Sequence, residues 1–171
     1  STVPATASKA GRKTRKSKRR APLSALEKAA NKLKNDHRVA IRASFTRAGF
    51  HRVTGVSDRE FTYDNQKSDL DDIFVYENVI ILAEYTCAQA SGVGEHLKNK
   101  KHIYDKILAD PEAFLNFLVE KFPSSANQLA ANYHIQQRIV KIVYCSRFDF
   151  DERHKANVPA PVYMDYPAVR Y

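Results

Sequence analysis

Several patterns that mark common protein classes are missing from this sequence of 171 residues. It contains no run of eighteen apolar residues, so we expect no helix that crosses a membrane. No apolar segment typical of a secretory signal peptide lies near its first residue. The two cysteines, Cys87 and Cys145, do not form a CxxC pair, so the sequence has no zinc signature. We therefore expect an intracellular, cytoplasmic protein with reduced thiols and without a membrane partner.

Signatures of several enzyme classes are absent as well. The six histidines form neither an HExxH motif nor a pair four residues apart, so no metal role is expected for them. The small-residue segment 91–94 has no following Gly-Lys-Ser/Thr, which favours a flexible connection over a nucleotide-binding P-loop. No Ser/His or Cys/His pair is recognisable as nucleophile and base. Charged side chains are therefore the remaining candidates for a catalytic or binding site.

Acidic residues are absent from the first 21 residues, which hold eight of the 28 Lys and Arg residues. The other 150 residues carry 20 basic and 19 acidic side chains, hence a charge of about +1. A small, polar and basic tail cannot bury enough apolar surface to fold, so residues 1–21 are predicted to be disordered. Sequence-independent contact with DNA phosphates and a bland role, as a solubilising tail or localisation signal, are equally favoured. The candidate phosphate-binding residues are Arg12, Lys13, Arg15, Lys16, Lys18, Arg19 and Arg20.

One long helix is predicted over residues 24–48. Ser24 and Glu27 have the spacing of a capping box at its start, and Gly49 suits its C-terminal cap. Steps of three and four residues place one apolar stripe along this helix, which we expect to pack on one face of a sheet. The residues of the stripe are Leu26, Ala30, Leu33, His37, Ile41, Phe45 and Ala48.

The remaining chain alternates strand and helix patterns. An interrupted strand or strand pair is predicted over 50–63, helices over 95–108 and 110–122, and a strand over 137–148. Together they predict an α/β domain over residues 22–148, with a central mixed β-sheet of about four to five strands flanked by helices. The proline-containing extension 149–171 shows no core stripe, and we expect it to lead into a further domain.

Residues 68–87 are the centre of this organisation. Two apolar runs, 73–76 and 79–83, flank the polar pair Glu77–Asn78, which is typical of a β-hairpin covered on both faces. With the turn at this pair, side-chain alternation puts Asp71 opposite Glu84 on one face, and Asp72 on the other face. Two carboxylates at one strand end repel each other, and a bound divalent cation such as Mg²⁺ relieves the repulsion. The alternative is that Glu84 pairs with a basic residue from a nearby helix.

The spacing of these carboxylates resembles that of the PD-(D/E)xK nuclease superfamily. Asp71 is followed after twelve residues by Glu84-Tyr85-Thr86, and the entry Asp69-Leu70-Asp71 is similar to that of the archaeal Holliday-junction resolvase-like branch. The resemblance implies a restriction-endonuclease-like core over roughly residues 24–148, in which Asp71 and Glu84 bind Mg²⁺ (or Mn²⁺) and act in catalysis. We expect Asp72 as a further metal ligand. Thr86 departs from the family, which has Lys at this position.

The missing lysine is expected on the helix that follows, as in some members of the superfamily. Lys98, Lys100 and Lys101 are the nearest lysines to Glu84 in sequence. We predict Lys101, and after it Lys98, as the catalytic lysine, and Lys100 as a contact to DNA phosphates. The alternative is that Leu97 and Lys101 belong to a core stripe in which the lysine extends its amine to water.

Three hypotheses for the function follow. The first is a metal-dependent DNA endonuclease that hydrolyses phosphodiester bonds at Asp71 and Glu84. The second is a catalytically degenerate nuclease-fold domain, which binds nucleic acid or a protein partner without cleavage; the departure at Thr86 favours it. The third is a general α/β interaction domain with a solvated Asp-rich turn. DNA is the expected partner, and a homodimer, a further domain or a protein partner stay open.

Overall fold

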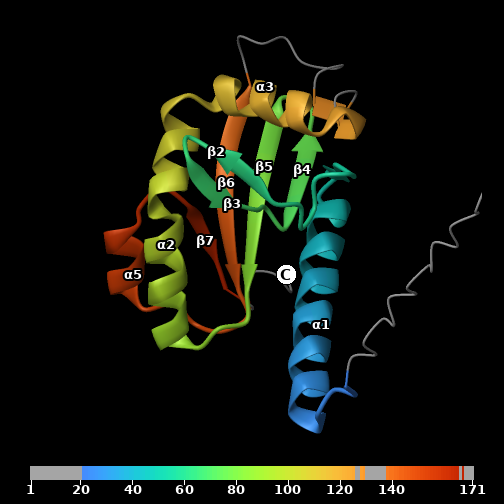
Figure 1. The fold of residues 1–171 in the computed structure, drawn as a ribbon, viewed down its shortest axis with the longest axis vertical. Coiled ribbons are helices and arrows are strands. Elements are labelled where there is room, and N and C mark those ends of the chain that lie inside the picture. Colours follow the sequence, from blue (N-terminus) through green and yellow to red (C-terminus); the bar gives the residue numbers. More distant parts are fainter. Residues whose placement is uncertain (1–20, 126–127, 130–137, 166, 168–171) are drawn as a thin grey trace, which may run out of the picture.

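The structure is a computed structural model, and it describes residues 21–125, 128–129, 138–165 and 167. Its centre is a five-stranded mixed sheet in the order β1-β4-β5-β6-β7 (Figure 1). The first three strands of this order pair antiparallel, and β5, β6 and β7 run parallel to one another. The α/β fold class with a mixed sheet flanked by helices is thus confirmed. The strands span His51–Arg52, Asp72–Tyr76, Val79–Thr86, Ile139–Ser146 and Val162–Met164, in that order.

Helices cover both faces of the sheet. The long α1 packs on one face, and α2 and α3 form the crossover from β5 to β6 on the other face (Figure 1). A separate two-stranded sheet, β2 and β3, adds to the face covered by α2 and α3. The bounds are Ala25–Arg47 for α1, Phe61–Tyr63 for β2, Gln66–Ser68 for β3, Ala90–Ala109 for α2, Pro111–Lys121 for α3, Pro123–Ser125 for the short 3-10 helix η1 and Glu152–Asn157 for α5.

The hairpin of β4 and β5 has the predicted register. Tyr76 pairs with Val79, and Asp72 pairs with Ala83 at the far end. Glu77 adopts a positive φ of 49°, which the tight turn requires. Both strands are covered on both faces, because alternate residues of each strand face α2 and α3 while the residues between them face α1. The first set contains Ile73, Val75, Ile80 and Leu82, and the second contains Phe74, Ile81 and Ala83.

Helix α1 begins and ends where the sequence predicts. Ser24 and Glu27 form both hydrogen bonds of the capping box. The predicted core stripe is wrong for the first two turns, since Leu26 is 84% exposed and Ala30 is exposed too; Leu33 is partly buried, and the fully buried residues of α1 are His37 and Ile41. The cause is geometric, because the N-terminal half of the helix extends past the end of the sheet (Figure 1).

The segment after β6 joins the same sheet. Strand β7 pairs with β6, and Val158 is buried in the larger core. Sequence periodicity gave no stripe here, because an edge strand of three residues is too short to show one. Whether a further domain follows stays a prediction. Among the described residues, no helix is both long and apolar enough to cross a bilayer.

Candidate functional site

Asp71 and Glu84 meet at the end of the hairpin that is remote from its turn. The backbone N–H of Tyr85 donates to Asp71 Oδ2 at 2.7 Å, and the N–H of Asp71 donates to the Ala83 carbonyl at 3.1 Å. These bonds hold the Asp71 side chain against β5. Its carboxyl group hydrogen-bonds the carboxyl group of Glu84, a residue that is only 2% exposed. The strand pairing therefore brings two acidic groups into direct contact, with Glu84 buried and Asp71 partly buried.

Both carboxyl groups hold their protons more tightly than usual. Burial raises the pKa of Asp71 from 3.8 to about 6, with smaller contributions from the charges of Asp58 and Asp69; the Tyr85 N–H and Glu84 oppose the rise. Burial also raises the pKa of Glu84 well above its ordinary value, and Asp71 adds to this effect while Lys100 opposes it. Two desolvated acids side by side favour a shared proton or a bound cation over two free charges.

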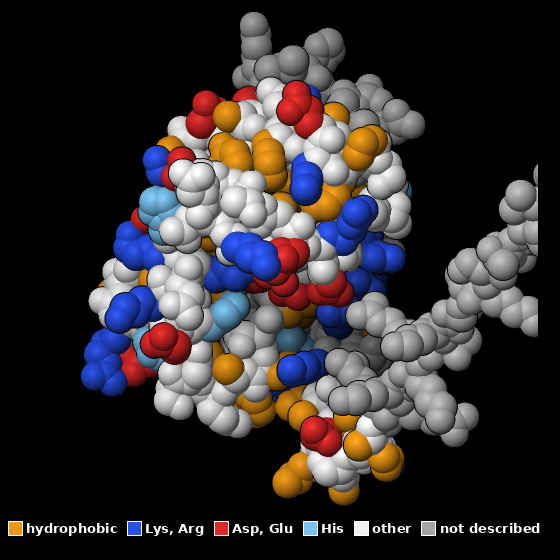
Figure 2. All heavy atoms as spheres, in the orientation of Figure 1, with side chains coloured by type: hydrophobic (Ala, Val, Ile, Leu, Met, Phe, Trp, Pro, Cys, Tyr) orange, Lys and Arg blue, Asp and Glu red, His pale blue; other side chains and the backbone are white. Residues whose placement is uncertain are grey.

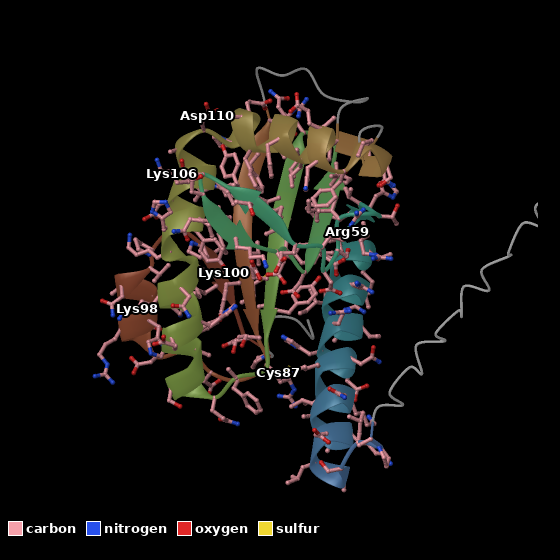
Figure 3. All side chains as sticks on the ribbon, viewed as in Figure 1. Arg59, Cys87, Lys98, Lys100, Lys106 and Asp110 are labelled. Carbon is pink, nitrogen blue, oxygen red and sulfur yellow. The ribbon has the colours of Figure 1, made fainter. Side chains whose placement is uncertain are left out.

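Lys100 of α2 supplies a cation at this pair. Its Nζ lies 2.9 Å from Glu84 Oε1 and 2.9 Å from Asp69 Oδ1. The same amine donates to Ser68 Oγ at 3.0 Å and to the Asp69 carbonyl at 2.9 Å. Burial opposes protonation of this lysine, but Glu84 and Asp69 outweigh it and raise its pKa. Figure 3 shows Lys100 extending from α2 toward oxygen atoms beside β5.

The structure brings Lys100 to Glu84, not the predicted catalytic residues Lys101 and Lys98. Lys101 forms an exposed ion pair with Asp105, with 2.5 Å between Nζ and Oδ2. Lys98 lies on the other side of α2, toward α5 (Figure 3), where it borders a small hollow together with Lys101. Each residue turns a helix by about 100°, so a lysine one position away points elsewhere.

The signal for Lys100 was present in the sequence. The buried residues of α2 include Leu97, Ile103, Tyr104 and Ile107. Lys100 stands three residues after Leu97 and four before Tyr104, so it lies on the same stripe of the helix. The alternative stripe through Leu97 and Lys101 differs from the observed one by about one position, because the buried residues Ile103 and Ile107 define a stripe that passes through Lys100. The DNA contact predicted for Lys100 stays a prediction.

Asp72, predicted as a further metal ligand, lies on the opposite face and anchors α1 to the sheet. Its carboxylate accepts two hydrogen bonds from Arg42, at 2.7 and 3.1 Å. The hydroxyls of Ser57 and Tyr85 donate to it as well, both at 2.6 Å. Burial alone would raise the pKa of Asp72, but Arg42, Ser57 and Tyr85 hold it below its ordinary value. The alternation of side chains along the strand therefore separates Asp72 from Asp71 and Glu84.

Thr86, at the position of the missing motif lysine, joins a chain of polar groups. Its hydroxyl accepts from the Ala88 N–H at 3.1 Å and hydrogen-bonds the hydroxyl of Tyr144. The Tyr144 hydroxyl in turn lies 2.6 Å from Nδ1 of His96, and Tyr144 pairs with Glu84 in the sheet. The sequence analysis did not predict Tyr144 or His96 as site residues. His96 stands one turn before Lys100, and this spacing could have indicated it.

A hollow of about 570 Å³ adjoins the acidic pair on the side of α1. One side of α1 from Ala30 to Arg38 forms one wall, and residues 85–88 at the end of β5 form the other. Asp71 contributes to both the hollow and the acidic pair. Figure 2 shows acidic side chains gathered near the centre of this face, with basic side chains on both sides and a recess below them. The site is thus open to a ligand from the α1 side.

The donor set fits a divalent cation that is completed by other ligands. Among the described residues, no group of three or more His, Cys, Asp and Glu side chains is placed to hold a metal ion. Mg²⁺ commonly binds proteins through one or two carboxylates and takes its other ligands from water and phosphate. Asp71 and Glu84 provide two carboxylates, and burial, which raises the pKa of both, opposes two uncompensated negative charges at this place.

The structure does not test two of the predictions made from the sequence. The cations predicted for the tail, from Arg12 to Arg20, lie outside the described residues. No protein-family model, curated protein or solved structure matches this chain. The nuclease resemblance therefore depends on the motif residues and on their arrangement alone.

Proposed function

We propose that this domain is a metal-dependent endonuclease that hydrolyses phosphodiester bonds in DNA. The observation that carries the proposal is the contact of Asp71 with Glu84, with Lys100 at 2.9 Å from Glu84. A structural core seldom contains two adjacent acids with raised pKa values, whereas phosphoryl-transfer sites use such pairs to bind a cation. DNA is then the partner, and the free thiols of Cys87 and Cys145 agree with a reducing cytoplasm.

Asp71 and Glu84 would hold Mg²⁺ or Mn²⁺. When bound, such an ion lowers the pKa of a water molecule and polarises the phosphate that this water attacks. Tyr85 orients Asp71 through its backbone N–H, and β5 orients Glu84, so both ligands are positioned before any ion arrives. Lys100 opposes the rise of the Glu84 pKa that burial causes, and it would add a positive charge where negative charge develops on the phosphate.

One observation favours the second function, a nuclease-fold domain that binds nucleic acid without cutting it. Lys100 donates to four acceptors, on Ser68, Asp69 and Glu84, and so resembles a closed structural ion pair. The motif position itself holds Thr86, whose hydroxyl is occupied by Ala88 and Tyr144. In this function the acidic pair would be a remnant, and the domain would keep only its affinity for phosphate.

Nicking of supercoiled plasmid DNA separates the two functions. We expect nicking by the purified chain with Mg²⁺ or Mn²⁺, and none with EDTA. Glu84→Gln removes one carboxylate charge and keeps the shape, and it should lower the rate at least about 100-fold. Lys100→Met should lower the rate by a similar factor, whereas the matched variants Lys98→Met and Lys101→Met should retain it within about threefold.

Two results would contradict the nuclease proposal. DNA binding without nicking, over several DNA substrates and both metals, would favour the degenerate domain. Nicking that Glu84→Gln does not reduce would show that the activity comes from another site or from a contaminant. Circular dichroism and thermal unfolding of each variant provide the control for folding.

A further inference from the structure

The hollow beside Asp71 is lined by both apolar and polar side chains. Its two walls carry small or aliphatic side chains, which are Ala30 and Leu33 on α1 and Cys87 and Ala88 after β5. Figure 3 places Cys87 at the end of β5, in the space between the helices. A volume of about 570 Å³ falls within the range of pockets that bind small organic groups. Apolar walls facing each other suit a nucleobase, which buries two flat faces at once.

His37 also lines this wall. Its Nε2 lies 3.1 Å from the Cys145 carbonyl oxygen, which can only accept, so Nε2 carries the proton. Nδ1 is therefore an acceptor, and it is buried without a partner among the described residues. Burial lowers the pKa of His37, so the ring stays neutral at pH 7. A neutral imidazole ring with one unpaired acceptor therefore borders the hollow.

Basic groups at the hollow suit the phosphates on either side of such a base. Lys34 and Arg38 stand one turn apart on α1, and both border the hollow. Asp58 holds the Arg38 guanidinium through two contacts, at 3.0 and 3.2 Å, so the position of this side chain is set by the fold. Lys34 forms no ion pair within the described ranges and is available to a phosphate. Basic groups and apolar side chains thus border the same hollow, as a nucleotide requires.

We propose that this hollow binds one unpaired nucleotide of a DNA strand, next to the phosphate that is cleaved. This inference rests on the proposed nuclease function, and it names the substrate class as DNA with at least one base outside a base pair. Asp71 lines the hollow and touches Glu84, so a nucleotide in the hollow would lie directly beside the acidic pair. A paired base cannot enter between the walls, because it must first leave the stack.

Fluorescence of 2-aminopurine tests this proposal in the absence of cleavage. The full chain, in EDTA, is titrated into a single-stranded oligonucleotide with one 2-aminopurine, and into the same oligonucleotide in a perfect duplex. We expect fluorescence of the single strand to change at least about twofold as the base enters the apolar slot, and that of the duplex to stay constant. Anisotropy of a fluorescein-labelled oligonucleotide gives the Kd, which should be at least tenfold lower for the single strand.

Leu33→Trp fills the hollow and is the critical variant. Leu26→Trp is its matched control, because Leu26 lies on the same stripe of α1, is 84% exposed and does not border the hollow. Leu33→Trp should weaken binding of the single strand at least tenfold, and Leu26→Trp should leave it within about twofold. Lys34→Met, on the exposed surface, should weaken binding about threefold and make it less dependent on salt.

The pocket proposal would be overturned if Leu33→Trp and Leu26→Trp bound the single strand equally and had equal melting temperatures. It would also be overturned if the wild type preferred the duplex. Because these measurements need no metal and no cleavage, they fail or succeed separately from plasmid nicking. Nicking with no preference for unpaired DNA would contradict the pocket while the nuclease proposal stands. Single-strand binding that Leu33→Trp removes, in a chain that never nicks, would support the pocket and reject the nuclease.

Discussion

Asp71 and Asp72 are neighbours in sequence, and the structure gives them opposite surroundings. Asp72 is fully buried and receives hydrogen bonds from Arg42, Ser57 and Tyr85, which hold its pKa below the ordinary value. Asp71 lies against a second acid, Glu84, and burial raises its pKa to about 6. The charge of Asp72, on the face of α1, is matched by partners within the fold, whereas the charge of Asp71, beside Glu84, is not.

The comparison teaches how to distinguish a structural acid from a functional one. A structural carboxylate has its charge and its lone pairs matched by the protein, so removing a partner weakens the fold. A functional carboxylate is held in an unfavourable state that a ligand can relieve, so neutralising it can strengthen the fold. Four measurements test this difference between the two aspartates and their surroundings.

The largest effect is expected when Asp72 loses its main partner. Arg42→Met leaves a buried carboxylate without its bidentate guanidinium, and we expect the free energy of unfolding to fall by about 4 kcal/mol. Urea unfolding at pH 7 measures it. Arg47→Met, on the exposed last turn of the same helix, should change stability by less than about 0.5 kcal/mol. Similar losses in both variants would show that Asp72 does not depend on Arg42.

Asp71→Asn should have the opposite sign. The folded protein holds the Asp71 proton up to about pH 6, and the unfolded chain releases it near pH 3.8. Protonated Asp71 therefore contributes its full stabilisation below pH 3.8. This contribution to the free energy of unfolding is lost as the pH rises through 6, and the loss amounts to up to about 3 kcal/mol. Without metal, Asp71→Asn should therefore be more stable than the wild type above pH 6, and nearly equal to it at pH 4.

Urea unfolding of the wild type and Asp71→Asn at pH 4, 5, 6 and 7 measures this difference. Asn can still accept from the Tyr85 N–H, so the local backbone is preserved. A variant that is less stable than the wild type at every pH would show that Asp71 has a structural role like that of Asp72. The comparison between the two aspartates would then fail.

Metal addition should stabilise the wild type by a smaller amount. An ion that binds only the folded state contributes about 2 kcal/mol when its free concentration exceeds its Kd roughly 30-fold. Thermal unfolding with and without Mg²⁺ at pH 7 measures the shift. We expect Asp71→Asn and Glu84→Gln to lose it, and Lys101→Met to keep it. A shift that persists in both acid variants would place the ion elsewhere in the chain.

The smallest effect concerns His96, on the same side of α2 as Lys100. Burial and the charge of Lys100 lower the pKa of His96, while Asp69 opposes them. Lys100→Met should therefore raise this pKa, and NMR titration of the His96 ring measures it. Lys101→Met is the control, since its amine is directed to Asp105. An unchanged His96 titration would show that Lys100 does not act on the polar chain of His96, Tyr144 and Thr86.

Much of the fold and part of the site follow from local patterns. The turn at Glu77–Asn78 sets the hairpin register, and the period of two along a strand then separates Asp71 from Asp72. The capping box predicts the start of α1 correctly. The buried length of α1 could not be predicted, because the apolar stripe continues through Leu26 although the sheet does not reach that far. A stripe shows which side of a helix can pack, and the neighbouring elements determine how much of it does.

The meeting of Asp71 with Glu84 is a consequence of the sequence, since two strands joined by a tight turn have little freedom in how they pair. Which of the three neighbouring lysines contacts Glu84 is determined by the tertiary structure. Leu97, Tyr104 and Ile107 of α2 pack in the core against the sheet. This packing fixes the orientation of the helix about its axis, which determines which amine reaches Glu84. The hollow beside Asp71 has the same origin, because it forms only where α1 extends past the end of β5 and residues far apart in the chain become its walls.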